Sequence, residues 1–536
     1  MFGQFLNEAR TRYQSSLKEP AVKDFSNYDL IKFIIPDENC LEFSYKPKFK
    51  VEFSPKSLVD EISQLNSESE KFLQQINTLI FNVKNENQVK VLISLRNSVT
   101  NFRIRYPSHC QNLPVKDACS LKSDKDKGKI LIANRDIAIG EIICSDDSYA
   151  FALTDNYAFA CAGCLTITPF LIPCDYCSEV GFCSVSCGHN SRKRHSYECG
   201  YIKAIQLQSC AGWNESSALK ELNIKSPKIL HLAFNTVSGT NSTDLKALID
   251  RDPKNCQFLS GQRPPVEYEG FNNLNSLNRL LTNNEKMTLA KRWQYAVASI
   301  QLAYILKLKG YLTLDNGESM EFHHLCSFLM FCIQVVSTNG HSRSMPVVPF
   351  DEKTISLHSI RHIEFTSNLF TKFSLVNHSC TPNATRVSLG KGKEILVAMQ
   401  SIKNGDEILD NYGFDYFSGD KVTRQKDLLD QYYFLCQCRA CNENWKFDIL
   451  SMLTTSSEKK VDQIHKEFTD YFYQDSYNIN SEMLDKFIEK HWKLLMKMKR
   501  KLEKIRTISC KPAVQFPFNQ CLLTLLDLKY SPMLIV

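Results

Sequence analysis

The feature that most constrains this chain is a run of cysteines at the spacing of metal ligands. Between positions 161 and 199, seven cysteines and His195 occur in the order Cys161-x2-Cys164, Cys174-x2-Cys177, Cys183-x3-Cys187 and His195-x3-Cys199. Zn²⁺ takes four thiolate or imidazole ligands in a tetrahedron, and a short Cys-x2-Cys turn supplies two of them from one loop. Eight ligands fill two closed sites and leave no open coordination position. The pattern therefore predicts structural zinc rather than hydrolytic zinc.

Zinc ligation is favoured over a disulfide framework, the other interpretation of a cysteine-rich segment. Disulfide frameworks are typical of small secreted domains. The first residues, Met1 to Tyr13, carry Glu8, Arg10 and Arg12 and lack the apolar run of a signal peptide. The longest apolar stretch, Phe328 to Val336, is much shorter than the roughly 20 residues of a membrane helix. We therefore expect a protein of the cytoplasm and nucleus with no membrane segment.

Hydrophobic periodicity gives a coarse map of the secondary structure. Apolar residues recur at helical spacing in segments 59–80, after the cap-like pair Ser54-Pro55, and in 89–102, 290–308, 322–336 and the last hundred residues. β-rich segments are 130–133 and 141–144, expected to pair as a hairpin across Ile139-Gly140, and 365–373 and 394–399. The polar stretch 235–269 is expected to be an exposed insertion. The basic run from Lys493 to Arg506 reads as an amphipathic helix with a solvated face.

A second group of motifs lies between positions 377 and 441. In chain order they are Asn377-His378-Ser379-Cys380, Pro382-Asn383, Gly405-Asp406-Glu407-Ile408, Asn411-Tyr412-Gly413 and Cys436-x-Cys438-x2-Cys441. The last motif supplies three ligands, whereas a structural zinc takes four. Cys380 is the natural fourth ligand. The sequence thus predicts a third zinc site that ties Cys380 to the later cysteines.

Both groups of motifs resemble known families. The first resembles the MYND zinc finger, which implies cross-braced sites: Cys161, Cys164, Cys183 and Cys187 hold one zinc, and Cys174, Cys177, His195 and Cys199 hold the other. The second group resembles the SET domain with its post-SET zinc loop. Together, over about residues 120–445, they resemble the SET-and-MYND (SMYD) protein-lysine methyltransferases. The resemblance is to the type with N-terminal helical repeats, here shortened or diverged.

This resemblance implies methyl transfer from S-adenosylmethionine to a lysine amine. A free lysine has a pKa of about 10.4, so the amine must be desolvated and lose its proton in a narrow channel. Tyrosine hydroxyls suit such a channel, because they orient the amine without adding a full charge. Tyr412 stands at the family's catalytic tyrosine position, and Tyr432, within Gln431-Tyr432-Tyr433-Phe434, matches the second channel tyrosine.

The same resemblance implies a set of cofactor-binding residues. These are Asn377 and His378, with Ser374 just ahead of them, Asn339 for the methionine portion, Phe434 packed on the adenine, Tyr412, and the turn Lys127-Gly128-Lys129. The family's turn is Gly-x-Gly, whereas Ile130 stands here in place of the second glycine. Ile130 lacks the backbone freedom of glycine, so the turn is expected to have a different shape.

The resemblance also implies an α+β architecture, in which a SET-domain β core is interrupted by a MYND zinc finger. The expected regions are an N-terminal helical region (1–120), the first part of the SET domain (121–150), the MYND finger (161–199), a helical insert (200–340), the SET core (341–415), the post-SET zinc region (416–445) and a C-terminal helical region (446–536).

The expected partner is a protein substrate that offers a lysine, from a histone or another protein. Three zinc sites lower the formal net charge of +7 to about +2, because their thiolates outweigh the metal charge. Direct nucleic-acid binding is therefore not expected, and the chain is expected to be a monomer. The MYND resemblance adds proline-containing peptides as partners. The alternative function is a non-catalytic MYND/SET adaptor in transcriptional regulation.

Overall fold

The computed structural model describes residues 3–18, 20–37, 41, 103–107, 115–125, 127–154, 160–168, 171–177, 179–206, 227–251, 256–260, 270–348, 360–445, 459–472, 481–503 and 512–535. The helices predicted at 59–80 and 89–102, with the Ser54-Pro55 cap, lie outside these residues. None of the helices within the described ranges is both long and apolar enough to cross a membrane.

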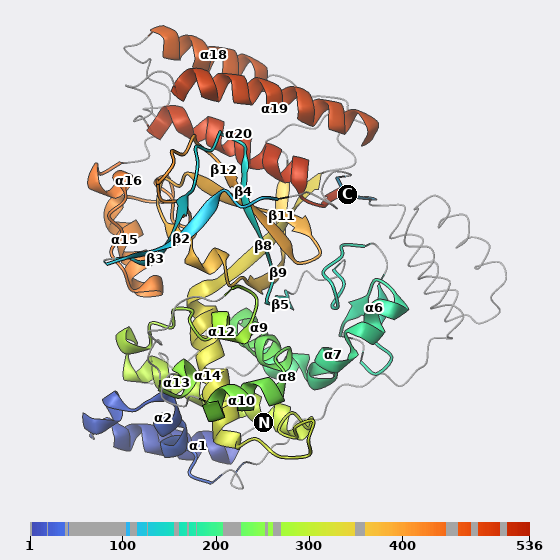
Figure 1. The fold of residues 1–536 in the computed structure, drawn as a ribbon, viewed down its shortest axis with the longest axis vertical. Coiled ribbons are helices and arrows are strands. Elements are labelled where there is room, and N and C mark those ends of the chain that lie inside the picture. Colours follow the sequence, from blue (N-terminus) through green and yellow to red (C-terminus); the bar gives the residue numbers. More distant parts are fainter. Residues whose placement is uncertain are drawn as a thin grey trace, which may run out of the picture.

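Two β-sheets form the centre of the molecule, with helices above and below them (Figure 1). The larger sheet has the order β1 (Arg103–Arg105), β14 (Met533–Ile535), β8 (Gly340–Val348), β9 (Arg361–Leu369) and β5 (Ala150–Leu153). The second has the order β11 (Ala384–Gly390), β12 (Lys393–Ala398) and β4 (Ile142–Asp147). Two-stranded pairs join β2 (Cys119–Asp124) to β3 (Gly128–Ala133), β6 (Ile172–Pro173) to β7 (Gly181–Phe182), and β10 (Asn377–His378) to β13 (Leu409–Asp410).

The hairpin predicted between 130–133 and 141–144 is wrong. Strand β3 pairs with β2, and β4 pairs with β12 instead. The chain between them bridges to the later motifs, with Ile137 opposite Ile402. Gly140 has a φ of +78°, and a Cβ there would lie 2.7 Å from the Trp492 ring. The glycine is therefore needed for close packing on a distant helix, not for a hairpin turn.

The two long helices of the insert are confirmed as α13 (Leu289–Leu308) and α14 (Phe322–Asn339). Thr288 caps α13 by accepting a hydrogen bond from the Lys291 amide. Both helices are buried along most of their length, as expected for helices that are apolar on several faces. They form the main hydrophobic core together with the N-terminal helices α1 (Gly3–Ser16) and α2 (Asn27–Ile34).

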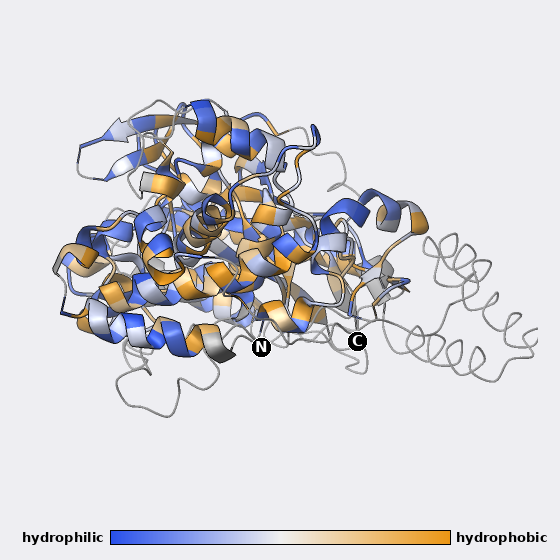
Figure 2. Cartoon of the chain, turned by 90° about the horizontal axis from the view of Figure 1, so that it is seen from below, coloured by the Kyte–Doolittle hydropathy of each residue, from blue (hydrophilic) through white to orange (hydrophobic). Residues whose placement is uncertain are grey.

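The exposed insertion predicted at 235–269 is also wrong for its described part. This stretch forms the end of α9 (Pro227–Ser238), α10 (Ser242–Arg251) and α11 (Gln257–Ser260). Leu245 and Phe258 are fully buried in the main core. The polar residues belong to helices with one buried face, as the mixed colouring of the helices in Figure 2 illustrates. Residues 261–269 lie outside the described ranges.

The C-terminal helices cover the second sheet. α18 (Lys459–Phe472), α19 (Ser481–Glu503) and α20 (Pro512–Tyr530) pack with β11 and β12 in a separate core (Figure 1). Lys499, part of the basic run predicted to face solvent, is buried, and its Nζ donates to Asn519 Oδ1 at 2.6 Å. Burial lowers the pKa of Lys499 to about 8.

Replacing Lys499 with Met should stabilise the fold. Burying the ammonium costs free energy, and this cost lowers the pKa of Lys499 in the folded protein below the usual value of 10.5. By linkage the gain should be about 3 kcal/mol below pH 8 and should fade as the pH rises toward 10.5. Chemical denaturation of Lys499→Met across this pH range tests it. The exposed neighbour Lys497→Met is the control, and equal effects for the two variants would contradict the prediction.

Candidate functional site

Three groups of ligand side chains converge as the sequence predicts. The sets are Cys161, Cys164, Cys183 and Cys187; Cys174, Cys177, His195 and Cys199; and Cys380, Cys436, Cys438 and Cys441. Within each set the ligand atoms lie within 4.8 Å of one another, and every cysteine is a free thiol. Four thiolate or imidazole ligands at this separation fit a tetrahedral Zn²⁺.

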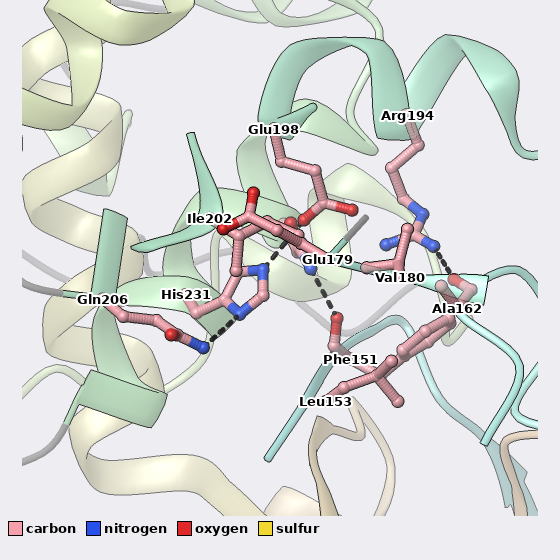
Figure 3. A pocket seen from close by; sticks show the side chains of 11 residues that line it. Phe151, Leu153, Ala162, Glu179, Val180, Arg194, Glu198, Ile202, Gln206 and His231 are labelled. Carbon is pink, nitrogen blue, oxygen red and sulfur yellow. Dashed lines mark hydrogen bonds and ion pairs between the residues drawn. The ribbon is translucent and has the colours of Figure 1, made fainter. Parts of the chain in front are cut away.

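The second set is supported by a buried carboxylate. His195 directs Nε2 at the sulfur atoms of Cys174 and Cys177, at 3.2 and 3.5 Å. Its Nδ1 lies 3.1 Å from one oxygen of Glu198, and the other oxygen lies 2.8 Å from Nε2 of His231 on α9 (Figure 3). Burial alone would raise the pKa of Glu198, but the two histidines lower it well below its usual range. Such a partner fixes the ligand tautomer and strengthens a metal site.

The third set ties two segments of the chain together. Cys380 Sγ lies 3.9 Å from Cys436 Sγ and 3.6 Å from Cys441 Sγ. Cys380 follows β10, whereas the other three ligands follow α15 (Lys421–Tyr432) and flank the start of α16 (Arg439–Asn442). The buried Arg424 of α15 donates to the Gly419 carbonyl at 2.5 Å. This convergence fixes the segment that contains Tyr432 and Phe434.

Four aromatic side chains cluster beside this third set. The Tyr412 ring centre lies 4.9 Å from that of Tyr432, 5.2 Å from His378 and 6.4 Å from Phe434. The Tyr412 hydroxyl donates to the Val376 carbonyl at 2.7 Å, and the Tyr432 hydroxyl donates to the Tyr412 carbonyl at 3.3 Å. Burial raises the pKa of both phenols, so both are neutral near pH 7.

His378 has a structural role in this cluster. Its Nδ1 accepts a hydrogen bond from the Tyr412 amide at 3.1 Å, and its Nε2 lies 3.4 Å from Cys380 Sγ. Burial lowers the pKa of His378 to about 4, so the imidazole is neutral. Both ring nitrogens are therefore used within the protein. His378 could therefore contact a cofactor only through its ring face or its backbone.

Glu407 links the predicted cofactor residues, a role that the sequence interpretation missed. One of its oxygens accepts from Asn377 Nδ2 at 3.0 Å, and the other lies 2.5 Å from Lys127 Nζ. Gly128 has a φ of +77°, whereas Ile130 is a strand residue opposite Lys122. Ile130 was expected to change the shape of the turn. The turn does not require a glycine at position 130, because only Gly128 has a positive φ.

The other predicted cofactor residues use their donors locally. Asn339, at the end of α14, donates to the carbonyls of Leu281 and Val335, both at 2.8 Å. Ser374 lies in a single 3-10 turn and donates to the Phe370 carbonyl. Lys129 Nζ donates to Ser123 Oγ at 2.8 Å across the β2–β3 pair. These side chains hold the surrounding backbone in place.

A largely buried ion pair lies next to Tyr412, and no local pattern of the sequence predicts it. Arg386 Nε of β11 donates to Asp410 Oδ2 at 2.5 Å, and Asp410 precedes Tyr412 by two residues. Arg386 also contacts His341 of β8. A second pair, Arg343 with Glu394 at 3.2 Å, is almost completely buried. Arg386 is the cation that acts to lower the pKa of both Tyr412 and Tyr432.

Comparison with known proteins agrees with this arrangement. Residues 128–413, more than half of the chain, match the SET domain family model. "Protein-lysine N-methyltransferase SMYD4" of Pongo abelii is 23% identical over 374 residues, which are 59% of this chain and 45% of that protein. "N-lysine methyltransferase SMYD2-B" of Xenopus laevis is 26% identical over 322 residues, 60% of each chain.

A SET and MYND domain-containing protein of Dictyostelium discoideum is 26% identical over 362 residues, which are 60% of this chain and 81% of that protein. The match to this chain thus spans only about half the length of the SMYD4 and SMYD2 relatives. The chain belongs to the SET domain family, and its similarity to these relatives supports the SET-and-MYND resemblance predicted from the sequence.

Proposed function

We propose that this chain is an S-adenosylmethionine-dependent protein-lysine N-methyltransferase that acts on a histone or another protein. The observation that carries the proposal is the cluster of Tyr412, Tyr432, His378 and Phe434, in which His378 is buried and the other three rings are partly buried. Its two neutral phenols lie ring to ring, and each donates to a backbone carbonyl. A non-catalytic adaptor would not need this arrangement.

The chemistry of these residues fits the cofactor. S-adenosylmethionine, when bound, supplies an activated methyl group on a positively charged sulfur. Aromatic faces and carbonyl oxygens attract such a cation, and Phe434, Tyr412 and the Val376 carbonyl offer both. The Glu407 carboxylate and the Lys127 ammonium are charged groups suited to the amino-acid end of the cofactor. We propose that these residues hold it together with the backbone near Asn377 and Asn339.

The residues of the chain then prepare the lysine amine. The aromatic cluster excludes water, and desolvation lowers the pKa of an amine that enters it. The two phenol oxygens orient the neutral amine without placing a full charge beside it. Such positioning of reacting groups contributes several kcal/mol to a displacement. The positive charge of Arg386 is neutralised by Asp410, which keeps the surroundings of the amine close to neutral.

We also propose three structural zinc ions, one in each ligand set, and a docking role for the finger. A cavity of about 360 Å³ lies on the finger beside the exposed ring of Tyr176. Arg192 and Phe182 also line it. A proline-containing peptide of a partner or substrate protein would fit such an aromatic, basic surface. We further propose that the protein is a monomer and that it is found in the cytoplasm and the nucleus.

Removing the Tyr412 hydroxyl should slow methylation without loss of cofactor binding. Tyr412→Phe keeps the ring in the cluster and removes only the group proposed to orient the amine. Single-turnover methylation should fall by ~10² or more, as for loss of a positioned polar group. Cofactor affinity should change little in a parallel titration. Tyr416→Phe, another buried tyrosine of the same segment, is the control and should react at the parent rate. A parent rate for Tyr412→Phe would remove this residue from the catalytic role.

Metal analysis should give three zinc equivalents per chain. Cys380→Ser should remove one equivalent and weaken cofactor binding and activity together, because it releases the segment of Tyr432 and Phe434. Cys326→Ala is the control, since Cys326 is buried in α14 outside all three sets. Two equivalents in the parent protein, together with native alkylation of Cys380, would contradict the third site.

A further inference from the structure

A strained residue separates the two aromatic side chains of the post-SET segment. Tyr433 has φ 62° and ψ 31°, the left-handed conformation, and its amide donates to the Leu429 carbonyl to end α15. This conformation is strained for a bulky L-residue, and glycine or asparagine usually occupies it. Tyr432 and Phe434 flank the turn, and both face Tyr412. The turn at Tyr433 therefore sets how these two rings lie in the site.

Two lysines of the helical insert hold Tyr433 in place. Lys291, in the first turn of α13, donates from Nζ to the Tyr433 hydroxyl at 2.8 Å. Lys286, five residues earlier, donates to the Tyr433 carbonyl at 3.4 Å. Both contacts join segments more than 140 residues apart in the sequence. Backbone strain of this kind persists only where the surroundings over-determine it.

The contact of Lys291 continues into the helix that ends at Asn339. The Lys291 ammonium lies 6.0 Å from the ring centre of Tyr295 on α13. The Tyr295 hydroxyl donates to Ser337 Oγ at 2.9 Å, and Ser337 lies two residues before Asn339 on α14. One set of contacts thus connects Asn339 with the aromatic segment, which are two of the regions proposed to hold the cofactor.

We propose that Lys291, assisted by Lys286, is a positioning residue that clamps Tyr433 in its left-handed turn. The clamp holds Tyr432 and Phe434 against Tyr412 and makes the helical insert the anchor of the site. The assignment rests on the proposed function, because it deepens the account of the same site. An ordinary surface hydrogen bond would contribute little to stability and nothing to the placement of these rings.

Four variants separate a clamp from a merely stabilising contact. Lys291→Met keeps the length of the side chain and removes the ammonium, and Tyr433→Phe removes only the hydroxyl. Both should lower turnover about tenfold or more, since small displacements of positioning groups are costly. Their effects should not add in the double variant, because both break the same contact. Tyr433→Asn favours the left-handed turn without help from Lys291, so it should retain more turnover than Tyr433→Phe, whereas a merely stabilising contact would be lost equally in both.

Hydrogen exchange supplies a measurement that does not depend on activity. In Lys291→Met, amide exchange should rise in residues 430–436, while the zinc content and the melting temperature stay at parent values. Lys307→Met is the control. Lys307 lies on α13, as Lys291 does, and its ammonium also lies near an aromatic ring, that of Phe322 on α14. Parent-like exchange and turnover in Lys291→Met would overturn the clamp. If the parent protein does not methylate, the proposed function fails, and exchange alone decides the clamp: a rise in 430–436 supports it and parent-like exchange overturns it.

Discussion

The candidate site depends above all on the convergence of Cys380 with Cys436, Cys438 and Cys441. The strand that carries Asn377 and His378 and the helix that carries Tyr432 are distant in the sequence, and this convergence joins them. The His378 imidazole extends this junction, because it lies against Cys380 on one side and accepts from the Tyr412 amide on the other. The convergence of the four cysteines, the ring packing and the placement of Tyr412 are therefore parts of one arrangement. A zinc ion held by these four cysteines would act on geometry, because a closed site leaves no open position for bond making.

Buried charge fixes the other side of the same tyrosine. Arg386 and Asp410 join β11 to β13, and β13 leads directly to Asn411 and Tyr412. Burying an ion pair costs desolvation, whereas losing one partner costs about 3–5 kcal/mol because the other charge is stranded. Such a pair adds little net stability but tolerates few alternative positions of the strand. Glu407 plays a similar part for Asn377 and Lys127.

The sequence was informative wherever the signal is local. Ligand spacing identified the zinc ligands, the MYND resemblance divided the first eight into two sets, and the count of four ligands pointed to Cys380 for the third. Helical periodicity predicted α13 and α14 within a few residues. It failed where pairing is decided by distant residues. Gly140 looked like a hairpin turn, but its conformation serves a contact with Trp492. Strand β2 went unrecognised because Cys119–Asp124 is mostly polar, and one face of it is exposed. Glu407, Arg386 and the Lys291–Tyr433 contact acquire meaning only from partners far away in the chain. The predicted domain boundaries and the individual cofactor contacts remain predictions.

The central claim is that the aromatic cluster and the segments around it form a working cofactor site. Calorimetric titration of the zinc-loaded full chain with S-adenosylmethionine tests this claim most directly. The account predicts saturable binding of one molecule per chain with a dissociation constant in the micromolar range. Absence of measurable binding by a folded protein that retains all three metal ions would contradict it and would favour the adaptor function.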